Sequence, residues 1–152
     1  MERAVQKLIV GLLSVLLPLP SIAGGAIEDI AVTDVQILAM SEGQINTAAY
    51  MKLVNDCRCE EHALIAAYSP VAREIELHSY EEANGRMKMR QIDEIILQSN
   101  SELIFKPGGP HLMLMGVKKQ IKDGDSVPLT LEFEDGSRLE LTAHVKKMWR
   151  MN

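Results

Sequence analysis

The chain has 152 residues, of which 16 are Lys or Arg and 21 are Asp or Glu, so its formal net charge at pH 7 is −5. Phosphate contacts need a basic face, so an acidic chain of this kind is excluded as a nucleic-acid binder. Only two cysteines are present, which excludes a disulfide-stapled scaffold and leaves stability to an ordinary hydrophobic core.

Residues 1–23 have the features of a secretory signal peptide. They have a basic start, an apolar run that ends at Pro18, and small residues at Ser21 and Ala23. The run before Pro18 is about half of the roughly 20 residues needed to span a bilayer. We therefore expect cleavage after Ala23 and export of residues 24–152 as a single domain that lacks a membrane anchor.

The exported part consists of strand-like segments separated by turn signals. The segments are residues 27–38, 47–55, 73–80, 86–91, 101–106, 111–117, 127–134 and 137–145. Asn84-Gly85 is a strong signal for a two-residue hairpin turn, and residues 93–100 could form a helical turn. Short strands with turns every eight to twelve residues predict an all-β sandwich or small barrel.

The segment "HLMLM" alternates two kinds of side chain. Leu112 and Leu114 are ordinary core residues, so His111, Met113 and Met115 should point away from the core. The same alternation in "IELHSY" buries Ile75 and Leu77 and turns His78 outward. In "RMKMR", Met87 and Met89 share one face, and the basic residues share the other.

The hairpin turn links two of these outward faces. With a two-residue turn, Tyr80 lies opposite Met89, and His78 lies opposite Gln91. Met89 then becomes a diagonal neighbour of His78, roughly 7–8 Å away between backbones. His111 and Met113 would add a second pair of ligands if the end of their strand lies nearby.

Two thioethers and two imidazoles are a ligand set for Cu(I). Thioethers are soft neutral donors that bind Cu(I) and have low affinity for Zn, Mg or Ca, and imidazole also binds copper well. Thiolates would bind Cu(I) too, but they oxidise in an oxidising compartment. A blue-copper electron-transfer site needs a Cys ligand close to a His, and the cysteines lie elsewhere. For each residue taken alone, core packing by Met or a solvated His remains the alternative.

The spacing of these residues resembles that of the periplasmic copper chaperones called PCuAC. Ten residues separate His78 from Met89, twenty-one separate Met89 from His111, and one separates His111 from Met113. The stretches "AAYMKLVN", "ALIAAYSPVAREIELH", "MKMRQIDEI" and "FKPGGPHLMLMGVKKQIKDGDSVPLTLEFEDG" also resemble that family in order and spacing. Two features depart from the family pattern. Tyr80 stands where many members have Met, and the C-x-C pair has no counterpart that we recognise.

The resemblance implies a cupredoxin-like β-sandwich that holds Cu(I) at an exposed site in the periplasm. It implies His78, Met89, His111 and Met113 as the ligands. It further implies delivery of copper to the CuA centre of cytochrome c oxidase, directly or through a Sco-type thiol protein.

Several further residues are candidates for auxiliary metal binding. They are Met87, Met115, Cys57, Cys59 and His144. Met87 and Met115 are either alternate thioethers or an apolar rim for docking. Cys57 and Cys59, followed by His62, could form a second soft-metal site or a redox pair. Two loop thiols with no dedicated role, or a strained disulfide across this short separation, are the simpler interpretations. The tail with His144, Met148 and Met151 could recruit copper, including Cu(II), but we expect a solvated, frayed terminus.

The leading hypothesis is a Cu(I) carrier and not an enzyme, because the sequence has no catalytic triad, carboxylate pair or phosphate loop. Copper buffering with the same site but no oxidase partner is the second hypothesis. A structural β-sandwich with incidental His and Met residues is the third. Met40 and Met51 are expected in the core.

Overall fold

The computed structural model describes residues 25–58 and 60–151. The expected signal peptide and Cys59 lie outside the described residues. One short helix, α1 (Ala26–Asp29), precedes the strands. The strands are β1 (Ile30–Leu38), β2 (Thr47–Asn55), β3 (His62–Tyr68), β4 (Glu74–Ala83), β5 (Arg86–Gln91), β6 (Ile95–Leu97), β7 (Ser101–Ile104), β8 (His111–Met115), β9 (Ser126–Phe133) and β10 (Arg138–Lys146).

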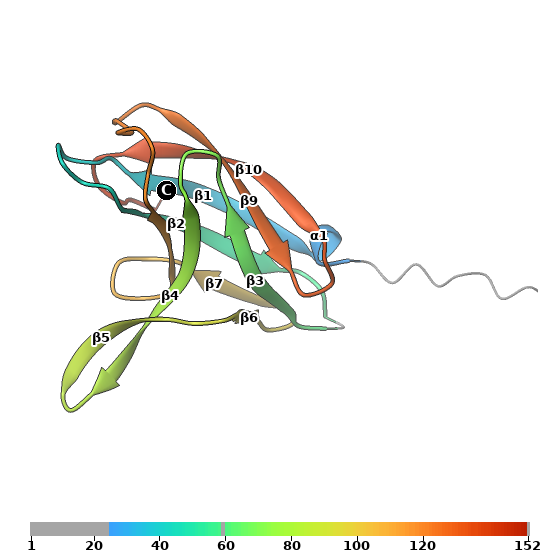
Figure 1. Cartoon of the computed structure of the whole chain (residues 1–152). Coiled ribbons are helices and arrows are strands. Elements are labelled where there is room, and N and C mark those ends of the chain that lie inside the picture. Colours follow the sequence, from blue (N-terminus) through green and yellow to red (C-terminus); the bar gives the residue numbers. More distant parts are fainter. Residues whose placement is uncertain (1–24, 59, 152) are drawn as a thin grey trace, which may run out of the picture.

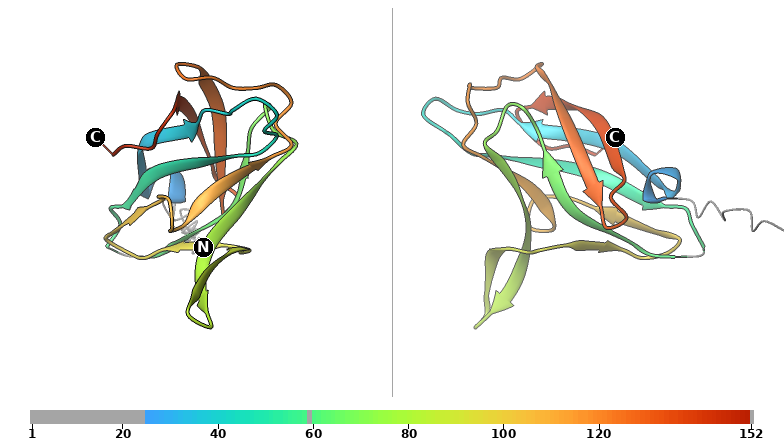
Figure 2. Two further views of the ribbon diagram at one scale, coloured as in Figure 1. Left: turned by 90° about the vertical axis from the view of Figure 1, so that its left-hand side faces the viewer. Right: turned by 45° about the vertical axis from the view of Figure 1, so that its right-hand side comes forward.

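The strands form one continuous hydrogen-bonded path that curls around a core (Figures 1 and 2). Its order is β5-β4-β8-β2-β1-β10-β9-β3-β6, and β7 pairs with β2 off this path. β1 and β10 are parallel, and the other strand pairs are antiparallel. β3 also packs close to β4, although they are far apart in the strand order. The prediction of an all-β, cupredoxin-like sandwich is confirmed.

The core is built from the faces that alternation assigns to it. Leu112 and Leu114 on β8 are fully buried, as is Phe133 on β9. Met40 and Met51 are also buried, as expected. Burial of large apolar side chains is the main force that holds such a sandwich together, at roughly 25 cal/mol per Å² of apolar surface.

The β4–β5 hairpin has the turn and register predicted from the sequence. Asn84 and Gly85 have φ angles of 55° and 72°, the left-handed conformations that a type I′ turn requires. Tyr80 pairs with Met89, and His78 pairs with Gln91. The turn chemistry therefore places Met89 beside His78 on one face of the sheet.

The expectation of a helical turn at residues 93–100 is wrong. Residues 95–97 form β6, an edge strand that pairs with β3. Ile95 and Leu97 are buried while Ile96 is 39% exposed, so this short run alternates with the period of a strand. Its β-branched residues also favour an extended backbone. None of the helices among the described residues is long and apolar enough to cross a lipid bilayer.

Candidate metal site

Two histidines face each other across neighbouring strands. His78 on β4 is paired directly with His111 on β8 in the antiparallel register. Their ring centroids lie 5.6 Å apart, with an interplanar angle of 64°. Both side chains lie on the face opposite Leu77 and Leu112, which point into the core. The face assignment made from alternation therefore holds, and β8 does lie next to β4.

The expectation of an exposed site is wrong for the two imidazoles. His78 is 9% exposed and His111 only 3%. The rings of Tyr50 and Tyr80 lie 6.1 Å and 5.9 Å from the His111 ring, measured between centroids. Trp149, from the C-terminal tail, packs edge-on against Tyr50 at 6.2 Å. Aromatic side chains therefore cover this outer face of the sheet.

A hydrogen bond determines which ring nitrogen of His111 is protonated and which is left to bind a metal. Its Nδ1 lies 2.9 Å from the carbonyl oxygen of Gly109. A carbonyl can only accept, so Nδ1 carries the proton and Nε2 keeps its lone pair. Burial lowers the pKa of His111, opposed by the Gly109 hydrogen bond and reinforced by the nearby His78. The ring is therefore neutral at neutral pH, as a metal ligand must be.

In His78 it is Nδ1, and not Nε2, that is left to bind a metal. Its Nε2 lies 2.7 Å from a carboxylate oxygen of Glu76, two residues earlier on the same face. The carboxylate accepts, so Nε2 carries the proton. The other nitrogen, Nδ1, is buried without a hydrogen-bond partner among the described residues. A buried polar atom left unpaired costs about 1–3 kcal/mol, and a bound cation would remove that cost.

The two candidate thioethers lie on the same face as the histidines. Met113 is two residues from His111 and pairs with Glu76 across β4. Met89 pairs with Tyr80 and is diagonal to His78. Met113 is half-buried, whereas Met89 is 45% exposed. Two imidazoles and two thioethers on one face form a soft donor set that fits Cu(I).

The auxiliary candidates are not all brought to this face. Met115 follows Met113 on the same face of β8 and is half-buried. His144 is exposed on β10, three strands away from β8, which is roughly 14 Å at a spacing near 4.8 Å per strand. Cys57 is disulfide-bonded, and a sulfur in a disulfide does not offer a thiolate to a metal. Cys59 lies outside the described residues.

His62 belongs to a separate cluster. It is 4% exposed, and its Nε2 lies 3.0 Å from Asp29 while its Nδ1 lies 3.4 Å from Glu134. Asp29, Glu60 and His62 place possible ligand atoms within 4.8 Å of one another. Both ring nitrogens already have carboxylate partners, so we interpret His62 as a structural histidine that ties α1 to β3 and the end of β9.

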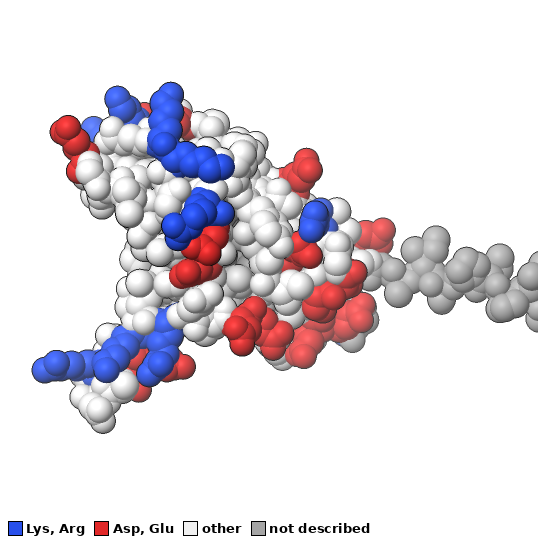
Figure 3. Space-filling view, in the orientation of Figure 1, with Lys and Arg blue, Asp and Glu red and all other residues white. Residues whose placement is uncertain are grey.

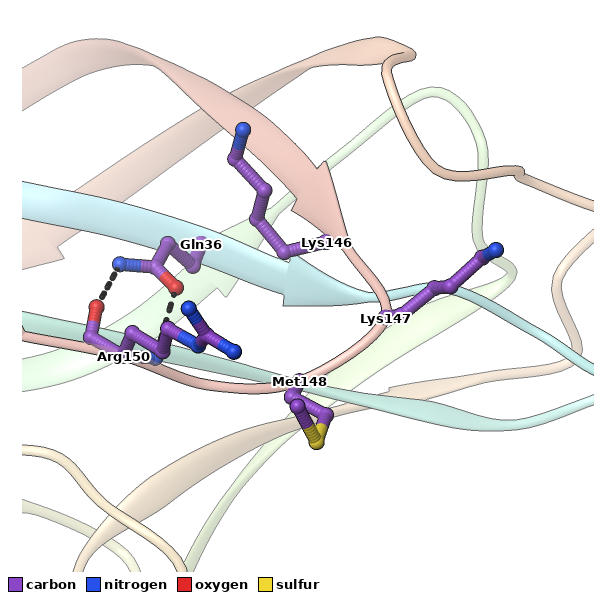
Figure 4. A pocket seen from close by; sticks show the side chains of 5 residues that line it. All are labelled: Gln36, Lys146, Lys147, Met148 and Arg150. Atoms are coloured by element: carbon purple, nitrogen blue, oxygen red, sulfur yellow. Dashed lines mark hydrogen bonds between the residues drawn. The ribbon is translucent and has the colours of Figure 1, made fainter.

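The expected frayed terminus is instead held against the sheet. The side-chain amide of Gln36 on β1 donates from Nε2 to the carbonyl oxygen of Arg150 and accepts the Arg150 N–H at 3.2 Å (Figure 4). Together with Lys146, Lys147 and Met148, these two residues line a surface hollow of about 450 Å³. We call residues 147–151 the C-terminal strap. It holds Trp149 on Tyr50, next to His111.

Sequence reasoning missed four parts of the site. Glu76 and Gly109 set the histidine tautomers, Tyr50 lies against His111, and Trp149 packs on Tyr50. Glu76 had a signal, because it lies two residues before His78 and therefore on the same face. Gly109 is also close in sequence, two residues before His111, but the bend that turns its carbonyl toward the ring has no residue pattern of its own. Tyr50 and Trp149 depend on contacts between distant segments and have no local signal.

The comparisons with known proteins agree with the fold and with the resemblance. A family model described as "Putative lipoprotein LpqE-like" matches residues 30–145. The chain is 33% identical over 84 residues to "Putative lipoprotein Lxx21020" of Leifsonia xyli subsp. xyli (strain CTCB07), which covers 55% of this chain and 51% of the relative. It is 31% identical over 94 residues to "Uncharacterized protein RP573" of Rickettsia prowazekii (strain Madrid E), covering 61% and 51% respectively. The chain thus spans about half the length of these two relatives.

Solved structures give longer matches. The copper-bound PCuAC domain from PmoF2 aligns with a TM-score of 0.69 and 25% identity, over 82% of this chain and 97% of that domain. The solution structure of apo-DR1885 from Deinococcus radiodurans aligns with a TM-score of 0.63 and 27% identity, over 97% of both chains. Its Cu(I) form aligns at 0.62 and 30% identity, over 78% of this chain and 76% of that one. The chain therefore belongs to the LpqE-like family, and its resemblance to the PCuAC copper chaperones is confirmed.

Proposed function

We propose that this domain binds one Cu(I) ion through His78, Met89, His111 and Met113 and carries it outside the cytoplasm. The observation that carries the proposal is the buried, unpaired Nδ1 of His78 beside the ring of His111. Copper is the cargo of such a protein. The copper-bound PCuAC domain from PmoF2 and the Cu(I) form of DR1885 support the proposal by similarity.

The exposure of the four residues fits a carrier. Three are buried or half-buried, so they can keep Cu(I) from water and oxidants, whereas Met89 is 45% exposed and open to a partner. Thioethers are neutral donors without a proton to lose, so copper can leave by ligand exchange with no change in protonation at the methionines. An arrangement that holds Cu(I) without cycling it supports a carrier and not an enzyme.

We further propose delivery to the CuA-bearing subunit of cytochrome c oxidase or to a Sco-type protein in the periplasm. The support is the family resemblance and the charge around the site. Lys and Arg side chains gather over the β4–β5 hairpin and, separately, over the upper part of the molecule, whereas Asp and Glu side chains gather near α1 (Figure 3). A positive patch of this kind would steer an acidic acceptor toward the open side of the site.

The binding proposal is tested by an anaerobic titration of residues 24–152 with Cu(I) against a chromogenic chelator. The wild type, a variant with all four residues changed to Ala, and a matched control, Met148→Ala, are compared. We expect one tight equivalent in the wild type and in the control, and its loss in the fourfold variant, with folding checked by circular dichroism. Tight copper retained by a folded fourfold variant would refute the assigned ligands, and its absence from the wild type would refute the function.

Delivery is tested separately by mixing the loaded domain with an apo CuA domain or a reduced Sco-type protein. Copper must move to the acceptor faster than it does from the chelator alone at the same free copper concentration. Copper that stays on the domain would favour buffering without a dedicated partner.

A further inference from the structure

The β4–β5 hairpin extends beyond the rest of the sheet. The pairing of β4 with β8 stops at His78 and His111, and beyond this point β4 pairs with β5 (residues 79–83 with 86–90). Figures 1 and 2 show the resulting two-stranded arm projecting from the body of the domain. All six residues of β5 are exposed. The arm begins at the candidate metal site and ends in solvent.

A second thioether lies on this arm beyond the four proposed ligands. Met87 is on the same face of β5 as Met89, opposite Glu82, and is 59% exposed. Two residues along a strand span about 6.8 Å, and a methionine side chain has three rotatable bonds. Both sulfurs can therefore reach one ion held between them. Exposure on this scale excludes core packing as the reason for Met87.

The charges on the arm leave this face open to a cation. Arg86, Lys88 and Arg90 alternate with the methionines and so lie on the other face of β5. Arg90 is further engaged by Glu81 at 2.6 Å. On the methionine face, the residue opposite Met87 is Glu82, whose carboxylate attracts a cation. A path from the hairpin turn to the histidines along this face passes two thioethers and no Lys or Arg of β5.

We propose that Met87 is a transient Cu(I) ligand through which copper enters and leaves the site. The inference rests on the proposed function and adds a transient binding step to it. On entry, a bond from copper to the Met87 sulfur forms as a bond to the donor breaks. The Met89 sulfur and then the two imidazoles take over as Met87 releases the ion. Copper stays Cu(I) throughout, and no proton moves, because thioethers carry none.

The competing role for Met87 is an apolar rim against which a partner packs. Leucine distinguishes the two roles, because Met→Leu nearly conserves volume and apolar surface while removing the sulfur. If Met87 is a transient ligand, copper transfer slows in both Met87→Leu and Met87→Ala. If it is an apolar docking surface, transfer from a protein partner slows in Met87→Ala alone. A small-molecule donor also removes the need for a protein partner, so a rim should not affect the rate at all.

The test is a stopped-flow measurement of Cu(I) transfer from a chromogenic chelator complex to the apo domain, residues 24–152. It is run anaerobically and at protein concentrations for which the rate rises linearly with concentration. Under these conditions, capture of copper by the protein limits the reaction. The wild type, Met87→Leu and Met87→Ala are compared with Met148→Leu, an exposed methionine outside the arm (61% exposed). Equilibrium affinity is measured for each by competition.

We expect both Met87 variants to keep the wild-type affinity but to capture copper about tenfold more slowly, within the one to three decades over which association rates vary among variants of one interface. Met148→Leu should behave as wild type. Wild-type rates in Met87→Leu would overturn the role as a transient ligand, and so would a loss of equilibrium affinity, which would make Met87 a resident ligand. Failure of the wild type to bind copper at equilibrium would instead overturn the proposed function itself.

Discussion

Releasing the C-terminal strap should uncover Tyr50, whose ring lies against His111, without unfolding the domain. The strap is held by the side-chain amide of Gln36, which is 7% exposed and makes two hydrogen bonds with the backbone of Arg150. Gln36→Leu keeps the volume of the side chain and removes both hydrogen bonds. The Arg150 N–H and C=O would then face an apolar group, so they should move out to water.

The size of the effect follows from the two lost hydrogen bonds. Each contributes a net 0.5–1.5 kcal/mol, so the docked strap should lose about 2 kcal/mol. That free energy corresponds to roughly a thirtyfold shift of the strap from closed to open. Trp149 should leave Tyr50 in the same event, because it lies next to Arg150 in the strap.

Fluorescence reports this motion directly, because Trp149 is the single tryptophan of the chain. In Gln36→Leu, we expect a red-shifted emission maximum and faster quenching by acrylamide, with the far-UV circular dichroism unchanged. Arg150→Ala is the matched control, since both hydrogen bonds use the backbone of Arg150, and its fluorescence should stay near that of the wild type. An unchanged emission in Gln36→Leu, or an equal change in Arg150→Ala, would refute the role given to the amide.

Three further predictions concern the site itself. Met89→Ala should weaken Cu(I) binding by roughly a hundredfold, since even an outer partner of a ligand is worth 10–100-fold, while its 45% exposure leaves the stability of the apo domain almost unchanged. Glu76→Gln should weaken binding by about tenfold, because a neutral amide orients His78 less strongly than a carboxylate. In the apo domain, burial lowers the pKa of His111 from its ordinary value of 6.5, so the unfolded chain takes up this proton more readily than the folded domain does. The free energy of unfolding should therefore be independent of this group above pH 6.5 and should fall as the pH drops below it.

Each of these has a measurement that separates it from a general loss of structure. Competition titrations give the affinities, with Met148→Ala as the control for Met89→Ala and with thermal unfolding of each apo variant beside them. Equal affinity of Glu76→Gln and wild type would remove Glu76 from the site. For the pH dependence, urea unfolding is followed from pH 7.5 to pH 5, and His111→Gln, which cannot titrate, should show a weaker decline below pH 6.5. An identical decline in that variant would assign the effect to other groups.

Local patterns in the sequence predicted much of the fold. The Asn84-Gly85 turn and the alternation in "RMKMRQ" were sufficient to predict the pairing of Tyr80 with Met89, because a two-residue turn leaves one register for the hairpin. Alternation likewise assigned Leu112 to the core and His111 to the other face, since neighbouring side chains on a strand point to opposite sides.

The cover over the site could not be predicted in this way. The ring of Tyr50 from β2 lies against His111, and Trp149 from the chain end packs on that tyrosine; these contacts join distant segments. Alternation gives the face of a side chain but does not say what packs on that face. The direct pairing of His78 with His111 is a further case, because nothing local sets the register between β4 and β8. The helical interpretation of residues 93–100 failed because a three-residue strand is too short for its period to be recognised.

The alternation of Arg, Met, Lys, Met and Arg along β5 also bears on solubility. β5 is the end strand of the sheet, and its unpaired backbone N–H and C=O groups could template the addition of a strand from a second copy. A second β5 laid against the first would bring Arg86, Lys88 and Arg90 of each chain close to the same charges on the other. Charged side chains on an edge strand are a common protection against such pairing. The domain can thus expose a methionine-bearing edge strand while the opposite face of the same strand opposes self-association.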